Sequence, residues 1–215
     1  MKTFVSIGCG VGIGLATAER FAREGYRTIL VSRTLANVER LANELDGKGY
    51  TAIARAADAS DPASLAALFK SVTDEFGPID AVHYNAASLR MSGWADQPID
   101  AINQDLAINV GGALATVCAV APGMAERGGG SILITGGGFA LYPAPDLLTL
   151  SMGKAALRNM VTAIAPDLET KGVHLATVTV CCYVQPDTAL QIGDLFWELH
   201  QEPKGSWCPD IMFNP

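Results

Sequence analysis

The sequence GCGVGIG occupies residues 8–14 and follows directly on the short apolar run Thr3 to Ile7. A run of this kind is typical of a buried parallel strand. Helical spacing of apolar residues begins immediately afterwards, at Ile13. Glycines let the backbone adopt positive φ and approach a ligand closely, and the amides at a helix start favour an anion. The order strand, glycine turn, helix therefore predicts a phosphate-binding turn, in preference to glycines that only ease tight packing.

Beyond this turn, strand-like and helix-like segments alternate along the chain. The expected strands are Thr3 to Ile7, Thr28 to Val31, Ala52 to Ala56, Ile79 to His83, Ser131 to Ile134 and Val173 to Val180. The expected helices are Ile13 to Arg23, Leu35 to Leu45, Pro62 to Phe76, Ile99 to Met124, Leu147 to Leu168 and Thr188 to His200, before a short tail. This alternation predicts one doubly wound α/β domain over residues 1–215, with a mostly parallel sheet, helices on both faces and ligands at the carboxyl ends of the strands.

Composition excludes several classes of partner. A net charge of -7 argues against binding to a nucleic-acid backbone. The 5 cysteines show no CxxC spacing, so we expect reduced thiols and no metal site. No continuous run of about 18 apolar residues is present, so we expect no membrane partner and a cytoplasmic location.

The end of the second strand bears on the choice of dinucleotide. It reads Val31-Ser32-Arg33, at the place where an NAD enzyme usually offers Asp or Glu to the ribose hydroxyls. Arg33 can instead pair with a 2′-phosphate, whereas an acid at position 32 would repel it. The residues favour NADP(H), with NAD(H) less favoured and a merely solvated Arg33 as the alternative.

Three motifs together resemble the short-chain dehydrogenase/reductase family over nearly the whole chain. They are the GxxxGxG spacing of residues 8–14, Asp58 after the third strand, and Asn85-Ala86 after the fourth, where Tyr84 and Ala87 replace two residues of the family's NNAG motif. The resemblance implies a Rossmann fold. It also implies cofactor contacts from Gly8, Gly10, Gly12, Ile13, Gly14, Ser32, Arg33, Asp58, Ala59, Asn85, Ala86, Ala87 and Lys154.

The same resemblance implies a catalytic helix that departs from the family pattern. Lys154 fits the lysine of the family's YxxxK, but Leu150 stands at the tyrosine position. Counting back to the family's serine leads to Gly137. Asn109 falls where the family keeps an asparagine of its proton relay, with a capping or core asparagine as the alternative.

A leucine cannot donate a proton, so another group would have to replace the tyrosine. Tyr142 and Tyr183 are the candidate donors, although a surface or core ring is the alternative for each. Ser151 ranks below them, because it lies about 100° around the helix from position 150. The three histidines show no ligand spacing, and we assign them no role.

Two functions follow from these residues. The first is an NADP(H)-dependent oxidoreductase acting on a small carbonyl or alcohol with an atypical proton source. The second is an inactive NADP(H)-binding sensor or partner subunit.

The resemblance also implies a homodimer or homotetramer built on the long helices. We expect an apolar substrate pocket formed by loops 88–98 and 136–145, with Trp94, Phe139 and Tyr142, and with Phe196 and Trp197 of the last helix as a candidate cover.

Overall fold

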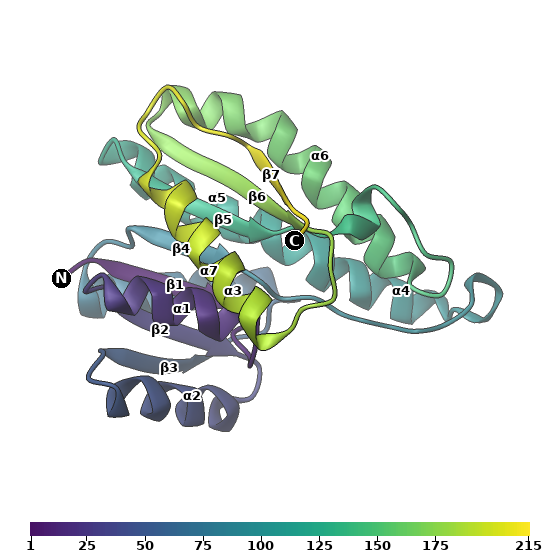
Figure 1. Ribbon diagram of the computed structural model, residues 1–215, viewed down its shortest axis with the longest axis horizontal. Coiled ribbons are helices and arrows are strands. Elements are labelled where there is room, and N and C mark those ends of the chain that lie inside the picture. Colours follow the sequence, from purple (N-terminus) through teal and green to yellow (C-terminus); the bar gives the residue numbers. More distant parts are fainter.

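A computed structural model describes all residues, 1–215, and its centre is one parallel sheet (Figure 1). The seven strands stand in the order β3-β2-β1-β4-β5-β6-β7. Their bounds are β1 Thr3–Ile7, β2 Arg27–Ser32, β3 Ala52–Ala56, β4 Ala81–Tyr84, β5 Gly130–Thr135, β6 Val173–Val180 and β7 Asp210–Phe213. The strand order reverses between β1 and β4, which confirms the predicted doubly wound Rossmann arrangement and places ligands at that switch point.

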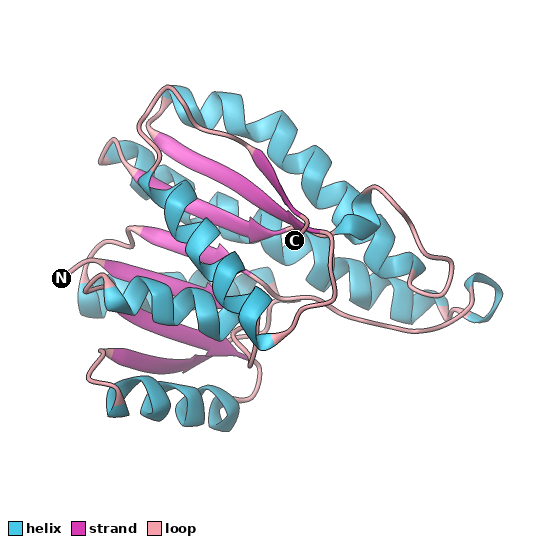
Figure 2. Ribbon diagram, viewed as in Figure 1, coloured by secondary structure: helices cyan, strands magenta, loops and turns pink.

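Helices cover both faces of this sheet (Figure 2). One face carries α1 Ile13–Arg23, α2 Leu35–Gly47 and α7 Pro186–Gln201. The other carries α3 Pro62–Phe76, α5 Gly112–Glu126 and α6 Leu148–Thr170. The short helix α4 Ile99–Leu106 extends the line of α5 beyond the end of the sheet (Figure 1).

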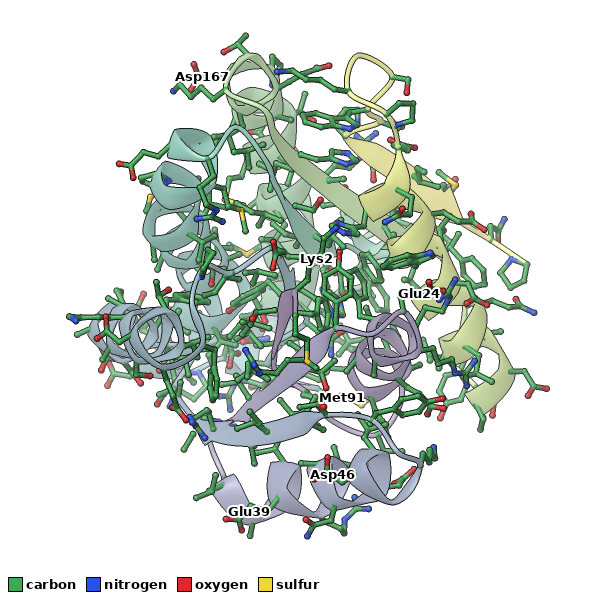
Figure 3. All side chains as sticks on the ribbon, turned by 90° about the vertical axis from the view of Figure 1, so that its left-hand side faces the viewer. Lys2, Glu24, Glu39, Asp46, Met91 and Asp167 are labelled. Carbon is green, nitrogen blue, oxygen red and sulfur yellow. The ribbon has the colours of Figure 1, made fainter.

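Alternating side chains of the strands feed the two core layers. Phe4 packs on the α1 side, where its ring stacks on Phe21 with 4.0 Å between centroids. Val5 and Ile7 join the cluster beneath α3, α5 and α6. Both faces of β1 are therefore apolar, as expected of a central parallel strand. Acidic side chains such as those of Glu39 and Asp167 lie at the periphery (Figure 3).

The long helix predicted from Ile99 to Met124 is interrupted. A π-helical turn, Ala107–Gly111, separates α4 from α5. The run Ile99–Glu126 is long and apolar enough, by length and composition, to cross a membrane. Here α5 packs against the sheet through Val117, Val120 and Met124, so it serves as a core helix of this fold.

Two expectations for the C-terminal part are wrong. The predicted tail forms β7, which pairs with β6 in parallel from Thr177↔Asp210 to Val180↔Phe213. Phe196 and Trp197 do not cover a pocket; Phe196 is fully buried, and Trp197 packs edge-on against Phe21 of α1. Helix α7 thus faces the core beside α1, away from the expected substrate loops.

Asp210 fixes β7 to the sheet. Its carboxylate accepts hydrogen bonds from Thr177 Oγ1 at 2.8 Å and Thr179 Oγ1 at 2.6 Å, and it pairs with Arg158 Nε at 2.7 Å. Burial alone would raise the pKa of Asp210, but these hydrogen bonds bring the pKa below its usual value.

We expect Asp210→Ala to lower the free energy of unfolding by about 1–3 kcal/mol, because it leaves the buried Thr179 hydroxyl without its acceptor and removes one of the two acceptors of Thr177. The folded-state pKa is depressed below the unfolded value. The contribution should therefore be present above about pH 4 and be lost as the pH falls through the folded-state pKa. Urea unfolding across that pH range tests this. Arg158→Gln, which removes only a half-exposed partner, should cost at most about 1 kcal/mol, and an equal loss in both variants would contradict the anchoring role.

Candidate functional site

The glycine turn at the end of β1 is held against the end of β4. Gly8 has φ +75°, and a Cβ at this position would lie 2.5 Å from Ala86 Cα. The amides of Gly8 and Cys9 both donate to Val31 O of β2, at 2.9 and 2.8 Å. No side chain caps α1, and the amides of residues 10–14 have no acceptor within the protein. The turn therefore offers free donors at a helix start, the arrangement that binds a phosphate.

Asn85 connects this turn to β5. Its Nδ2 donates to Gly8 O at 3.0 Å, and its Oδ1 accepts from Thr135 Oγ1 at 2.8 Å. Because the Thr135 hydroxyl proton is used there, Thr135 Oγ1 accepts from His83 Nε2 at 2.8 Å. Burial, together with the charge of Lys154, lowers the pKa of His83 to about 3, so this histidine is neutral. His83 is structural, and the role of Thr135 between Asn85 and His83 was not predicted from the sequence.

A groove of about 290 Å³ lies beside the turn at the carboxyl ends of β1, β2 and β4. Most of the predicted cofactor residues meet there, namely Gly8, Ser32, Arg33, Ala59, Asn85, Ala86 and Ala87. Gly10, Gly12, Ile13 and Gly14 form the adjoining turn and first residues of α1. The Arg33 side chain is exposed at the rim and makes no hydrogen bond or ion pair within the protein.

Asp58 stands next to this groove and does not line it. Its Oδ1 accepts hydrogen bonds from the hydroxyl and the amide of Ser60, at 2.7 and 2.8 Å. These bonds, aided by the charge of Arg33, lower the pKa of Asp58 below its usual value. A carboxylate therefore lies near the rim of the groove, and Ala59 is the residue of this pair that contacts the groove.

The π-turn orients Asn109. Tyr84, fully buried, donates its hydroxyl to Ile108 O at 2.5 Å within the turn. Asn109 then turns its amide toward the loop after β4, where Oδ1 accepts from Ser88 N at 2.7 Å and Nδ2 donates to Ser88 O at 3.2 Å. In this structure the Asn109 side chain holds that loop with one donor and one acceptor of its amide.

Asp105 is a site residue that the sequence analysis missed. It is 1% exposed and accepts from Ser88 Oγ at 2.6 Å, from Arg90 Nε at 2.9 Å and from Thr149 Oγ1 at 3.0 Å. Burial would raise the pKa of Asp105, but these donors bring it below its usual value. One carboxylate thus joins the loop after β4 to the start of α6. The only indication of this role in the sequence was the position of Asp105 four residues before Asn109.

Lys154 lies one helical turn after Leu150 on α6. Its Nζ donates to Thr135 O at 2.6 Å, and burial lowers the pKa of Lys154 to about 8. A Cβ at Gly137 would lie 3.4 Å from Lys154 Cε, an ordinary contact, and Gly137 has extended backbone. Leu150 is 4% exposed. The structure therefore brings Lys154 and Gly137 together, and neither Gly137 nor Leu150 supplies an ionisable group.

The two candidate tyrosines line a second groove. Tyr142 and Tyr183 are 75% and 84% exposed, and both border a groove of about 540 Å³ at the carboxyl ends of β5, β6 and β7. Phe139 lines it as predicted, whereas Trp94 lies exposed on the other loop and lines neither groove. Ser151 is buried away from the grooves, since its Oγ accepts from Ala144 N at 3.1 Å and donates to Leu147 O at 3.0 Å.

The predicted loops 88–98 and 136–145 lie side by side, and they project together from one end of the sheet (Figure 1). A single parallel bridge joins Ser92 to Leu147, and Ser92 N donates to Asp146 O at 3.0 Å. The two loops, the phosphate turn and both grooves therefore share the same edge of the sheet.

Known proteins resemble this chain in sequence and in fold. A family model described as short chain dehydrogenase matches residues 2–193. Oxidoreductase UcpA of Escherichia coli (strain K12) is 32% identical over 181 residues, which is 82% of this chain and 67% of that protein. Probable oxidoreductase EphD of Mycobacterium tuberculosis (strain ATCC 25618 / H37Rv) is 32% identical over 178 residues, 82% of this chain and 30% of that protein.

Solved structures share the fold at lower sequence identity. A metagenomic short-chain oxidoreductase in complex with NADP superimposes with a TM-score of 0.93 at 22% identity, covering 100% of this chain and 97% of that one. A short-chain dehydrogenase from Rhodopseudomonas palustris gives a TM-score of 0.91 at 21% identity, covering 100% and 98%.

We expect Gly8→Ala to lower the free energy of unfolding by about 2–5 kcal/mol, because a Cβ there combines a positive φ with a clash against the backbone of Ala86. Gly10→Ala is the matched control, since a Cβ at Gly10 meets nothing within 4 Å. Its effect should stay within about 0.5 kcal/mol. Urea unfolding of both variants measures the difference, and comparable stability of the two would refute the close approach of the turn to β4.

Proposed function

The chain belongs to the short chain dehydrogenase family and is an oxidoreductase of that family, and on this basis we propose that it uses NADP(H) on a small carbonyl or alcohol. One observation carries the proposal most. The glycine turn, whose amides at residues 10–14 are free, adjoins through Gly8 the groove that Arg33 lines. A neighbouring structure described as a complex with NADP has the same fold.

The residues present fit an adenosine-phosphate cofactor. The amides of residues 10–14 would hold the pyrophosphate, because they lack acceptors within the protein. Arg33 at the rim would pair with a 2′-phosphate, because its side chain lines the groove and makes no hydrogen bond or ion pair within the protein. Ala86 and Ala87, with no polar side-chain group, leave room along the groove between these two points. NADP(H), when bound, supplies or accepts a hydride.

The chain's own residues would do less acid–base chemistry than is usual in this family. Lys154 is buried, and its pKa is about 8. Most molecules therefore carry a protonated, positively charged Lys154 at pH 7. The Lys154 ammonium group donates a hydrogen bond to Thr135 O, and the lysine side chain lies beside Gly137. We propose Lys154 as the residue that orients the cofactor and favours negative charge nearby. Asn109 fixes the loop after β4.

The proton source is the atypical part of the proposal. Leu150 and Gly137 stand at the positions of the family's tyrosine and serine, so the active site is degenerate in this reading. Tyr142 and Tyr183 remain the candidate donors, because both line the larger groove. The competing proposal is an inactive NADP(H)-binding protein, a sensor or a partner subunit, and Leu150 and Gly137 favour it.

We also propose a cytoplasmic homodimer or homotetramer assembled on the outer faces of the long helices. The support is apolar surface on that side of the molecule. Leu114 of α5 and Met152 of α6 are exposed, as are the small residues Ala119 and Ala155. Such a surface is suited to helix packing between copies.

Calorimetric titration tests the cofactor. We expect NADPH to bind more tightly than NADH, and Arg33→Gln to weaken NADPH about 10- to 100-fold without changing NADH, because it removes a charge-assisted bond to the 2′-phosphate. Arg40→Gln, on the exposed side of α2, is the control and should change neither. Equal affinity for both cofactors in wild type and Arg33→Gln would remove the argument for NADP(H). Binding of neither would contradict the cofactor proposal itself.

Restoring the family's residues tests catalysis. The double variant Leu150→Tyr/Gly137→Ser should raise NADPH-dependent reduction of a panel of simple ketones about 10²- to 10⁴-fold, because it supplies a general acid. The control is Leu150→Phe/Gly137→Ser, which adds nearly the same bulk without the phenol and should give no such gain. Flat rates for both variants, with NADPH still bound, would favour the inactive binding protein.

A further inference from the structure

The larger groove, which we call the aromatic groove, carries no charge. No acidic or basic residue lines it; the lining residues are Phe139, Tyr142, Cys181, Cys182, Tyr183 and Met212, together with Gly138, Val180 and the polar Asn214. It lies where the end of β7 meets the loop after β6 and the turn after β5, near the C-terminus in Figure 1. Its volume of about 540 Å³ suits a small organic molecule.

The side chains around the aromatic groove are exposed to an unusual degree. Tyr142 and Tyr183 are exposed over three quarters or more of their surface, and Met212 is 55% exposed. Neither tyrosine hydroxyl has a hydrogen-bond partner in the protein, so the rings are not held by polar contacts. Aromatic rings and a thioether offer flat, polarizable contact area, which favours a planar ligand.

The residues near this groove also limit which anionic product can form when a carbonyl compound is reduced there. Lys154 donates to Thr135 O and is buried, while Gly137 and Leu150 carry no proton to give. Hydride addition to a simple ketone leaves an alkoxide, which is about as basic as hydroxide. Water, the conjugate acid of hydroxide, has a pKa of about 15.7. Hydride addition to one oxygen of a quinone leaves the other oxygen as a phenolate, whose conjugate acid has a pKa of about 10, as in tyrosine. Only the second anion forms readily without a positioned acid.

We propose that the aromatic groove takes a planar, uncharged quinone-type carbonyl compound and that the protein reduces it to the hydroquinone. The inference rests on the proposed NADP(H)-dependent function. The quinone takes up one hydride at a carbonyl oxygen, where an O–H bond forms; the hydride comes from a C–H bond of the reduced nicotinamide dinucleotide, which is oxidised. The second carbonyl oxygen receives that electron pair through the conjugated ring and takes its proton from water. Tyr142 and Tyr183 contribute their rings rather than their hydroxyls.

The two thiols in the groove affect the choice of probe. Thiolates add to quinones that have an open ring position. Burial raises the pKa of the Cys181 thiol, and its Sγ–H points to Thr179 O at 3.7 Å, so this group is a thiol rather than a thiolate. The probe 2,3-dimethyl-1,4-naphthoquinone has both open positions blocked, which separates reversible binding from alkylation.

Binding is measured first, without turnover. Calorimetry should show that 2,3-dimethyl-1,4-naphthoquinone binds the protein, and that 1,4-naphthoquinone-2-sulfonate binds at least tenfold more weakly, because its sulfonate finds no cation in the groove. Tyr142→Phe/Tyr183→Phe should retain the affinity, whereas Tyr142→Ser/Tyr183→Ser should lose it about tenfold or more. Both tyrosines are exposed, so these variants should fold. Equal binding of the charged and uncharged probes, or equal affinity in the serine variant, would overturn the proposed occupant.

Turnover is then compared with 1-tetralone, which has the same bicyclic skeleton but leaves an alkoxide. After subtraction of the protein-free rate, wild type should oxidise NADPH with the quinone and hardly at all with 1-tetralone. The double variant Leu150→Tyr/Gly137→Ser should raise the rate with 1-tetralone alone, so the quinone-to-ketone ratio should fall about 10²-fold. A lower quinone rate in Tyr142→Phe or Tyr183→Phe would show that a tyrosine is the acid and would refute this inference.

The outcomes separate the two proposals. If NADPH fails to bind, the proposed function is wrong, whatever the quinone does. If NADPH binds and wild type reduces 1-tetralone as readily as the quinone, or reduces neither, the proposed cofactor stands and the quinone inference is wrong.

Discussion

The lack of a Cβ at Gly8 is the constraint on which the site depends. It lets the turn after β1 lie against the backbone of Ala86, and Asn85 then reaches Gly8 O with its amide. From Asn85 the bonds continue through the Thr135 hydroxyl, and Thr135 O accepts from Lys154. The phosphate turn, the end of β5 and the lysine of α6 are thus connected by one short series of hydrogen bonds. Residues far apart in the sequence share a site because this central contact is close.

Much of the fold could be predicted because local patterns and tertiary structure agree. The strands β1, β3 and β6 and the helices α1 and α3 have the predicted bounds, since each apolar run ends at a turn or a cap. Asp61, for example, caps α3 by accepting from Ala63 N at 2.9 Å. The break at Ala107–Gly111 was not predicted, because a π-turn has no residue signature and here depends on a bond from Tyr84. Strand β7 was missed because its four residues are stabilised by contacts of Asp210 with β6 and α6.

The candidate site likewise contains residues that were predicted from the sequence and residues that were not. Residues such as Gly8, Arg33 and Asn85 were predicted as cofactor contacts from their place after a strand or from the family motif, and the structure gathers them around one groove. Asp105 and Thr135 were missed because their roles arise only from partners on other elements. Leu150 and Gly137 stand where the family resemblance implies a tyrosine and a serine. The structure adds that an extended backbone and ordinary contacts surround Gly137, so a small polar side chain has room there.

The double attachment of the two projecting loops has a consequence for motion. Asp105 binds the loop after β4 through Ser88 and Arg90 and binds α6 through Thr149, while Ser92 is bridged to Leu147. Neither loop can swing away without breaking the bonds that hold the other. Displacement of these loops is therefore a cooperative event, closer to local unfolding than to the nanosecond flexing of a free surface loop.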